Sequence, residues 1–252
     1  MKSRWPNRLW IIRHGESAGN VARDRAHLEG LDRIDIQQRD VDVPLSERGE
    51  TQSESLGRWF AALPAAQRPD VVITSPYMRA CGTAAAVEDA GGLAAGTARK
   101  IDERLREREF GVLDRLTSAG IKRLYPEHAD LRKSVGKFYH RPPGGESWCD
   151  VILRLRSLLD TMSLHFAERR VLVVAHQVVV LCLRYLLEDM TEAQILKIDG
   201  AGDVANCSIT EYAVRAGPAP AIPLELIRYN FIDHLHEAGA VVTAEPDRNA
   251  AQ

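Results

Sequence analysis

Two histidines in this chain of 252 residues directly follow apolar runs that are typical of buried strands. Arg13 and His14 come after the run 9–12, and His176 comes after the run 171–175. Open α/β sheets bind ligands at the carboxyl ends of their strands, so two such junctions on neighbouring strands would share one pocket. Several charge-assisted donors suit the oxygens of a phosphoryl group, and a neutral imidazole is a competent nucleophile near pH 7. For His14 taken alone, a chance basic turn after an edge strand is the alternative.

A third strand-to-helix junction supplies a second arginine. Residues 71–74 form an apolar run, and the alanine-rich stretch 77–90 predicts a helix with Arg79 in its first turn. Anions are favoured at a helix N-terminus, and an arginine there can clamp two oxygens of one phosphoryl group. A surface arginine is the alternative interpretation.

Carboxylates follow the predicted strand 99–101, at Glu107 and Glu109. A general acid for a leaving alkoxide must be a carboxyl group that its surroundings keep protonated, and a bound phosphoryl group would favour that form by its negative charge. Taken alone, glutamates in such a stretch are more often solvated surface charges, which is the alternative for both.

Length and composition exclude several classes of protein. With 45% hydrophobic residues the chain can bury a sizeable core, and a formal net charge of −2 without a basic stripe argues against a nucleic-acid partner. The longest apolar stretch, residues 171–187, is interrupted by polar residues and is not expected to span a membrane. The four cysteines lack paired spacing and the first residues lack an apolar signal segment, so we expect free thiols and a cytoplasmic protein.

Strand and helix patterns alternate along the chain. Apolar runs predict strands over 8–13, 71–74, 99–101, 171–175, 207–214 and 224–230. Helical periodicity predicts helices over 46–63, 77–90, 146–166 and 178–187. This alternation predicts an α/β fold: a three-layer α/β/α sandwich around a mainly parallel sheet of about six strands, the last two forming a hairpin.

Two segments interrupt the alternation. Residues 21–43 are densely charged and lack a long apolar face, and residues 111–144 contain short helical pieces. Both are interpreted as insertions that form a small helical lid or cap over the pocket, because long loops in compact domains are often functional. Solvated loops are the alternative. We expect a single domain over residues 1–238 and a disordered tail over 239–252, which is rich in small and polar residues.

Six motifs, in order along the chain, resemble those of the histidine phosphatase superfamily, which also contains the cofactor-dependent phosphoglycerate mutases. They are Arg13–Asn20 (Arg-His-Gly-x-Ser-x-x-Asn), Pro44–Gln52, Ser75–Arg79, Leu105–Gly111, Pro143–Ser147 and the second histidine, His176. Each motif alone is weakly specific, whereas six in the right order are highly specific. The resemblance covers about residues 8–235 and implies the α/β fold of that family.

The resemblance also implies a role for each residue of the expected pocket. His14 is implied to be the nucleophile, which is phosphorylated during turnover. Arg13, Arg79 and His176 are implied to hold the phosphoryl oxygens, and Glu107, which the motif selects over its neighbour at 109, to protonate the leaving oxygen. No metal and no other cofactor is expected.

The surroundings of the second histidine, His176-Gln177 and Tyr139–Ser147, are most similar to the fructose-2,6-bisphosphatase branch. That branch typically carries an arginine at the position of Leu181, where it helps to bind the phosphate that is not cleaved. The leucine therefore favours a phosphate monoester over a bisphosphorylated sugar. The residues expected to bind substrate are Ser17, Asn20, Gln177 and Arg141.

Four functions compete for this pattern. The favoured one is a phosphomonoester hydrolase for a small phosphorylated metabolite. A phosphoglycerate mutase shares the site, but the mutases carry Gly-Leu-Asn-Lys where this chain has Val112–Arg115. A non-catalytic phospho-ligand sensor would be indicated by loss of a site residue, and none is lost. A metal site built from His14, His176 and Glu107 is disfavoured because the neighbouring arginines would repel the ion. The pattern leaves the oligomeric state open.

Overall fold

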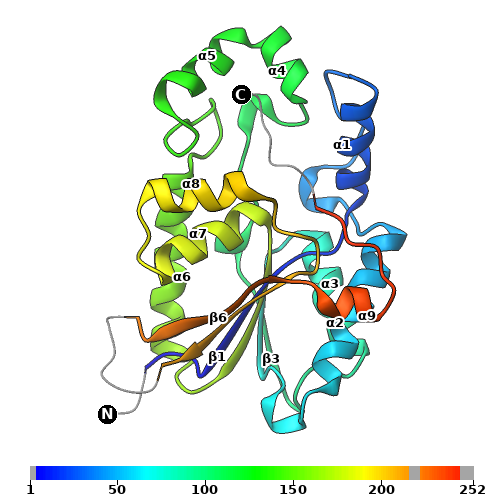
Figure 1. Cartoon of the computed structure of the whole chain (residues 1–252), viewed down its shortest axis with the longest axis vertical. Coiled ribbons are helices and arrows are strands. Elements are labelled where there is room, and N and C mark those ends of the chain that lie inside the picture. The colour runs from blue at the N-terminus through cyan, green and yellow to red at the C-terminus, as the bar shows by residue number, and fades with distance from the viewer. Residues whose placement is uncertain (1–3, 216–221, 245–252) are drawn as a thin grey trace.

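A computed structural model of the chain describes residues 4–215 and 222–244. Its centre is a six-stranded sheet in the order β3-β2-β4-β1-β5-β6, covered by helices on both faces (Figure 1). The strands are β1 (Arg8–Arg13), β2 (Val71–Thr74), β3 (Ala98–Ile101), β4 (Arg170–Ala175), β5 (Ile209–Val214) and β6 (Leu224–Phe231). The first four run parallel to one another, and β5 and β6 are antiparallel to their neighbours. The predicted sheet is therefore confirmed.

The helices expected from periodicity are present with nearly the expected ends. The helices are α1 (Ala18–Leu28), α2 (Glu47–Ala62), α3 (Met78–Asp89), α4 (Ser118–Leu124), α5 (Pro126–Val135), α6 (Trp148–His165), α7 (Gln177–Leu187), α8 (Glu192–Ala201) and α9 (Asp233–Glu237). Within the described residues, no helix combines the length and the apolar character that a membrane span requires. All four cysteines are free thiols, as expected.

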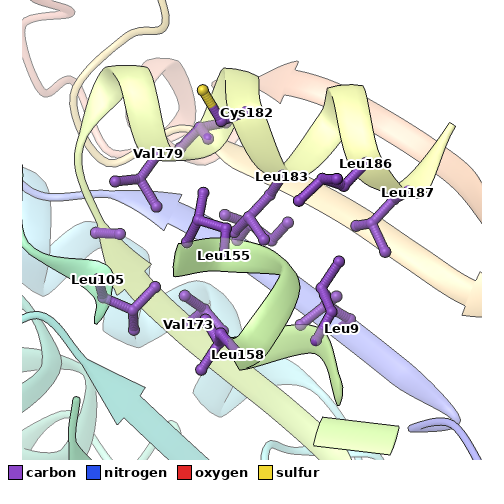
Figure 2. Packing of buried hydrophobic residues seen from close by; sticks show 14 of the residues in the cluster. Leu9, Leu105, Leu155, Leu158, Val173, Val179, Cys182, Leu183, Leu186 and Leu187 are labelled. Carbon is purple, nitrogen blue, oxygen red and sulfur yellow. The ribbon is translucent and has the colours of Figure 1, made fainter. Parts of the chain in front are cut away.

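Alternation along β1 divides the core between the two faces of the sheet. Leu9 and Ile11 join the cluster that α6 and α7 complete (Figure 2), while Trp10 and Ile12 join the cluster of α2 and α3. Successive side chains of a strand point to opposite faces, so this one apolar run supplies both layers of core. The three-layer sandwich follows from this division.

The two insertions bind each other rather than forming separate loops. Arg33 and Leu116 form an isolated antiparallel bridge, and the amide of Thr117 donates to the carbonyl oxygen of Asp32 at 2.9 Å. The second insertion has a small core of its own, which consists of Leu113, Leu116, Ile121 and Ala129. Segments 21–43 and 111–144 thus form one cap, whose helices α4 and α5 lie at the top of Figure 1.

The first insertion contains an element that its pattern did not predict. Helix α1 occupies its first part, although it has no apolar stripe. It begins with a capping box, in which the amide of Asn20 donates to Oγ of Ser17 at 3.1 Å and the amide of Ser17 donates to Oδ1 of Asn20 at 2.9 Å. Local capping rather than burial therefore starts this helix.

The expectation of a disordered tail over residues 239–252 is wrong for residues 239–244. Ala240 is buried, and Nε2 of Gln52 donates to the carbonyl oxygen of Val241 at 2.8 Å and to Oγ1 of Thr243 at 2.9 Å. Residues 239–244 are therefore packed, because hydrogen bonds from a buried glutamine hold a segment whose composition looks like a tail. Residues 245–252 lie outside the described part of the chain.

Candidate active site

Three strand ends meet at one edge of the sheet, because β2, β4 and β1 are neighbours. Arg13 pairs with Ala175 in the β1–β4 register, so His14 and His176 follow side by side, with ring centroids 5.1 Å apart. Ser75, which follows β2, has its Oγ 2.7 Å from Nε2 of His176. The prediction that the two strand–histidine junctions meet is confirmed.

His14 is held in one tautomer. Its Nδ1 lies 2.7 Å from the carbonyl oxygen of Gly15, which can only accept, so the ring proton is on Nδ1. Nε2 then accepts a hydrogen bond from Nε of Arg79 at 3.2 Å. Burial, with the charges of Arg79 and Arg13, holds the pKa of His14 well below its usual 6.5. The ring is therefore neutral near pH 7, the form that a nucleophile needs.

Helix α2 clamps the loop that carries His14. Ser46 caps the helix, and its Oγ also donates to Oε1 of Glu16 at 2.6 Å, while the amide of Glu16 donates to Oε1 of Gln52 at 2.8 Å. A Cβ on Gly49 would lie 1.9 Å from the carbonyl oxygen of Glu16. The serine, glycine and glutamine of the second motif thus hold the loop that carries His14, which explains their spacing.

Both predicted arginines are buried and line the pocket. Arg79 lies in the first turn of α3, as expected, and pairs with Asp40 of the cap at 2.9 Å. Arg13 donates to the carbonyl oxygen of Val204. Two guanidinium groups therefore line the same pocket as His14.

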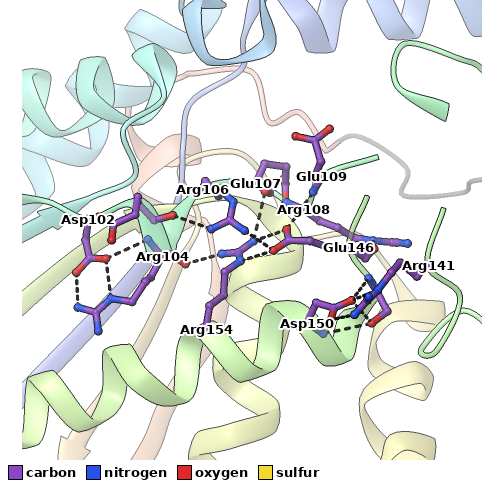
Figure 3. Close-up of polar contacts among 12 residues, drawn as sticks. Asp102, Arg104, Arg106, Glu107, Arg108, Glu109, Arg141, Glu146, Asp150 and Arg154 are labelled. Carbon is purple, nitrogen blue, oxygen red and sulfur yellow. Dashed lines mark hydrogen bonds and ion pairs between the residues drawn. The ribbon is translucent and has the colours of Figure 1, made fainter. Parts of the chain in front are cut away.

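Glu107, and not Glu109, faces the histidines. Oε2 of Glu107 lies 3.9 Å from Nδ1 of His176, and its side chain is 18% exposed. Glu109 is exposed, and its carboxylate accepts from the amide of Gly111 at 3.2 Å. Both glutamates are on one loop (Figure 3). The glutamate that the motif selects, Glu107, is the one that lies beside the histidines.

The Glu107 loop is held by an ion-pair network that sequence reasoning missed (Figure 3). Arg154 of α6 donates to both carboxylate oxygens of Glu146, at 2.9 and 3.1 Å, and to the backbone oxygen of Glu107 at 3.3 Å. Glu146 also accepts from the amide of Glu109 at 3.1 Å. Glu146 lies within the Pro143–Ser147 motif, whereas Arg154 had no local signal beyond lying outside the apolar stripe of its helix.

The second histidine stands at the N-terminus of α7. Burial, followed by the charge of Arg79, holds the pKa of His176 well below 6.5. Gln177 and Val178, the first residues of α7, line the pocket, and Nε2 of Gln177 donates to Oδ1 of Asp203 at 3.1 Å. The positive end of this helix therefore adds to the field of the two arginines.

Three of the four expected substrate-binding residues line the pocket, namely Ser17, Asn20 and Gln177. Arg141 does not. Its side chain is 62% exposed and pairs with Asp150 (Figure 3), which lies in the first turn of α6 and also accepts from Oγ of Ser147 at 2.7 Å. The capping carboxylate of α6 therefore holds this arginine away from the pocket.

The cap supplies the rim of the pocket. Its lining side chains are Arg23, Ile34, Ile36, Asp40, Val43, Asp114 and Arg115, and Phe110, just before the second segment, lies beside them. Arg115 joins the two insertions, donating to the carbonyl oxygens of Ile36 at 2.9 Å and Gln38 at 2.8 Å. Burial, followed by the charge of Asp40, raises the pKa of Asp114. Sequence reasoning placed both insertions near the site and considered the arginines of 21–43 as partners for a second phosphate, but it assigned none of these side chains to the pocket.

Sequence reasoning missed one further residue, which lies behind His14. Nδ2 of Asn206, which precedes β5, donates to the carbonyl oxygen of His14 at 2.9 Å. No local pattern predicts this contact, because it crosses from one strand end to another. Among residues 4–215 and 222–244, no group of three or more His, Cys, Asp or Glu side chains is arranged to hold a metal ion.

An α/β sandwich with two histidines and two arginines at the ends of parallel strands suits the binding of a phosphoryl group. The chain belongs to the histidine phosphatase superfamily (branch 1), whose family model matches residues 9–219. It is accordingly a phosphatase or mutase enzyme of the histidine phosphatase type.

Relatives that are named as mutases and relatives that are named as phosphatases are both found. Over 177 residues the chain is 32% identical to the probable phosphoglycerate mutase GpmB of Yersinia enterocolitica, covering 69% of this chain and 72% of that protein. Over 188 residues it is 30% identical to the 6-phosphofructo-2-kinase/fructose-2,6-bisphosphatase of Gallus gallus, covering 74% of this chain and 34% of that protein. The chain thus spans about a third of the length of this second relative.

Solved structures add a phosphatase with a similar fold. The structure of mycobacterial glucosyl-3-phosphoglycerate phosphatase with VO3 matches with a TM-score of 0.66 and 26% sequence identity. The match covers 89% of this chain and 99% of that one. The family and the three-layer fold are confirmed together.

Proposed function

We propose that this protein is a metal-independent phosphomonoester hydrolase that acts on a small phosphorylated metabolite through a phosphohistidine on His14. The observation that carries the proposal is the neutral Nε2 of His14, which faces Arg79 and lies beside Arg13 and His176. Cationic donors placed around the transferring group stabilise the charge on its oxygens. A cytoplasmic location belongs to the same proposal and is supported by the four free thiols.

The proposed reaction has two steps. Nε2 of His14 attacks phosphorus, the P–O bond to the leaving group breaks, and Glu107 gives its proton to the leaving oxygen. Glu107 then takes a proton from a water molecule that attacks the phosphohistidine, which releases inorganic phosphate and restores neutral His14. One carboxyl group can serve both steps, because the first step leaves it as a carboxylate and the second step needs a base.

A phosphoglycerate mutase is the second candidate, and the identity to GpmB favours it. The Gly-Leu-Asn-Lys stretch of the mutases is replaced by Val112–Arg115, and Arg115 is bound to backbone oxygens of the other insertion. A mutase must keep its phosphoenzyme until an acceptor arrives, whereas a phosphatase must lose it to water. The lifetime of the phosphoenzyme in water, with and without 3-phosphoglycerate, separates the two.

A monoester fits the pocket better than fructose-2,6-bisphosphate. Leu181 is buried in the core, and Arg184, which could have replaced the missing arginine, pairs with Glu188 at 2.8 Å. Two other candidates, Lys137 and Arg141, also pair with carboxylates. Of the arginines in 21–43, Arg23 lines the pocket and is the remaining candidate partner for a second phosphate. A charge-assisted contact is worth roughly 1.5–3 kcal/mol, so a second phosphate would lose that much affinity for each missing partner. A higher kcat/KM for the bisphosphate than for a panel of monoesters would contradict this.

A rapid-quench experiment tests the central proposal. Wild-type protein mixed with a ³²P-labelled monoester should give acid-labile, alkali-stable protein label, and His14→Ala should give none. Chelator treatment should leave both labelling and turnover intact. Stable labelling of His14→Ala, or turnover that requires an added divalent metal, would show that the mechanism is different.

A further inference from the structure

Among the cap residues that line the pocket, Asp40 binds Arg79. Nη1 of Arg79 donates to the carbonyl oxygen of Asp40 at 2.7 Å and to its Oδ1 at 2.9 Å, and Nη2 donates to Oδ2 at 3.3 Å. The side chain of Arg79 is 6% exposed and that of Asp40 is 47% exposed. A buried arginine of the α3 N-terminus is thus held by a residue of the 21–43 insertion.

The geometry leaves one edge of the guanidinium for the nucleophile. A guanidinium carries five N–H groups in a rigid plane. Asp40 takes both hydrogens of Nη1 and one of Nη2, so the remaining donors are Nε–H and the second Nη2–H, which share an edge. Nε–H of that edge already points at Nε2 of His14, 3.2 Å away. Such an edge matches two oxygens of a phosphoryl group.

A second neighbour sets the plane of the same group. The guanidinium carbon of Arg79 lies 4.8 Å from the ring centroid of Tyr77. The ring of Tyr77 also lies 4.9 Å from the ring of His176. Tyr77 therefore limits the tilt of Arg79, and the contacts with Asp40 determine which edge faces His14.

We propose that Asp40 is a positioning residue for phosphoryl transfer: it anchors one edge of Arg79 so that the other edge meets the phosphoryl group at His14. The inference rests on the proposed function only in requiring that this pocket binds a phosphoryl group. It gives the 21–43 insertion a specific role, which is to orient an arginine that another part of the chain supplies.

The direction in which phosphate affinity changes when the carboxylate of Asp40 is removed distinguishes a positioning role from a blocking role. If the carboxylate of Asp40 instead occupied the phosphoryl site and had to be displaced, its removal would tighten the binding of a phosphate. A positioning role predicts weaker binding, because Arg79 would then rotate away from the phosphoryl oxygens. Orthovanadate and inorganic phosphate are suitable probes, since they bind without turnover.

Calorimetric titration of full-length variants makes the test. Asp40→Ala should weaken vanadate and phosphate binding about 10-fold to 100-fold, the usual cost of a misplaced contact group. Asp40→Asn should weaken it less, because the amide oxygen still accepts one hydrogen bond. Asp42→Asn is the matched control: Asp42 lies in the same turn but pairs with the exposed Arg39 at 2.5 Å, and its substitution should change nothing.

A double-mutant cycle shows whether Asp40 acts through Arg79. Lysine has no second edge to orient, so Asp40→Ala should cost little further affinity in an Arg79→Lys background. Unchanged or tighter binding by Asp40→Ala would overturn the inference. An equally large loss of affinity on Asp40→Ala in the Arg79→Lys background would overturn it too. If wild type itself bound neither vanadate nor phosphate, the proposed function would fail instead. Equal melting temperatures across the variants confirm that the folded protein is being compared.

Discussion

The floor of the pocket and its rim are built in different ways. The floor consists of His14, His176 and two arginines at the ends of parallel strands, where ladder hydrogen bonds and two large cores hold the backbone. The rim comes from two insertions, of which the second has a core of only four buried residues, and the side chain of Asp40 on the rim is 47% exposed. The sheet therefore holds the groups to which we assign the chemistry, while a thinner structure holds those that would meet the rest of the substrate.

This division predicts that substitutions on the floor affect the chemical step and that substitutions on the rim affect the choice of ester. It also explains why the family motifs describe the floor in detail and the rim hardly at all. Preorganised groups need backbone that is held on several sides, whereas a rim that selects among leaving groups can be varied without disturbing the sheet.

The largest expected effect tests the floor. Glu107→Gln should lower kcat by about 10²–10⁴-fold on alkyl phosphates, because the leaving alkoxide then lacks its proton donor. An aryl phosphate, whose leaving group needs little protonation, should lose much less. Glu109→Gln is the control, since that side chain is exposed on the same loop. Equal losses on both classes of ester would indicate a structural role for Glu107.

A smaller effect is expected at the rim. Arg115→Ala removes two of the hydrogen bonds that tie the insertions together, so the rim should loosen. We expect KM for a preferred metabolite ester to rise about 3-fold to 30-fold, because two partly exposed charge-assisted bonds are lost, with kcat nearly unchanged. Lys133→Ala, on the outside of the cap, should have no effect. A fall in kcat for both ester classes would show that rim and floor are not separable.

The smallest effect concerns stability rather than activity, and lies away from the pocket. Burial lowers the pKa of His234 to about 4, against 6.5 for the unfolded chain. Between those values the unfolded state binds a proton that the folded state does not, so the free energy of unfolding falls as pH drops from 6.5 towards 4. His234→Gln should remove up to about 1.4 kcal/mol per pH unit of that slope, which urea titrations at several pH values would measure. An unchanged slope would contradict the burial of a neutral imidazole there.

The strand–helix alternation and the residues of the floor could be predicted from the chain alone. Strand periodicity, helix caps and the Arg-His-Gly, Ser-Pro-x-x-Arg and Leu-x-Glu patterns are local, and they identified His14, Arg79 and Glu107 with their elements. Parallel connectivity then brings the strand ends together, since neighbouring parallel strands end on the same edge of a sheet. These features depend on residues close to one another in the sequence.

The partners of those residues were decided by long-range contacts that leave no periodic signal. Asp40 binds Arg79 across 39 positions, Arg154 holds the Glu107 loop from another helix, and Arg141 is captured by the capping carboxylate of α6 instead of reaching the pocket. A charged side chain chooses among several partners according to where the backbone places them. That placement depends on the pairing of the two insertions and on their position beside the edge of the sheet.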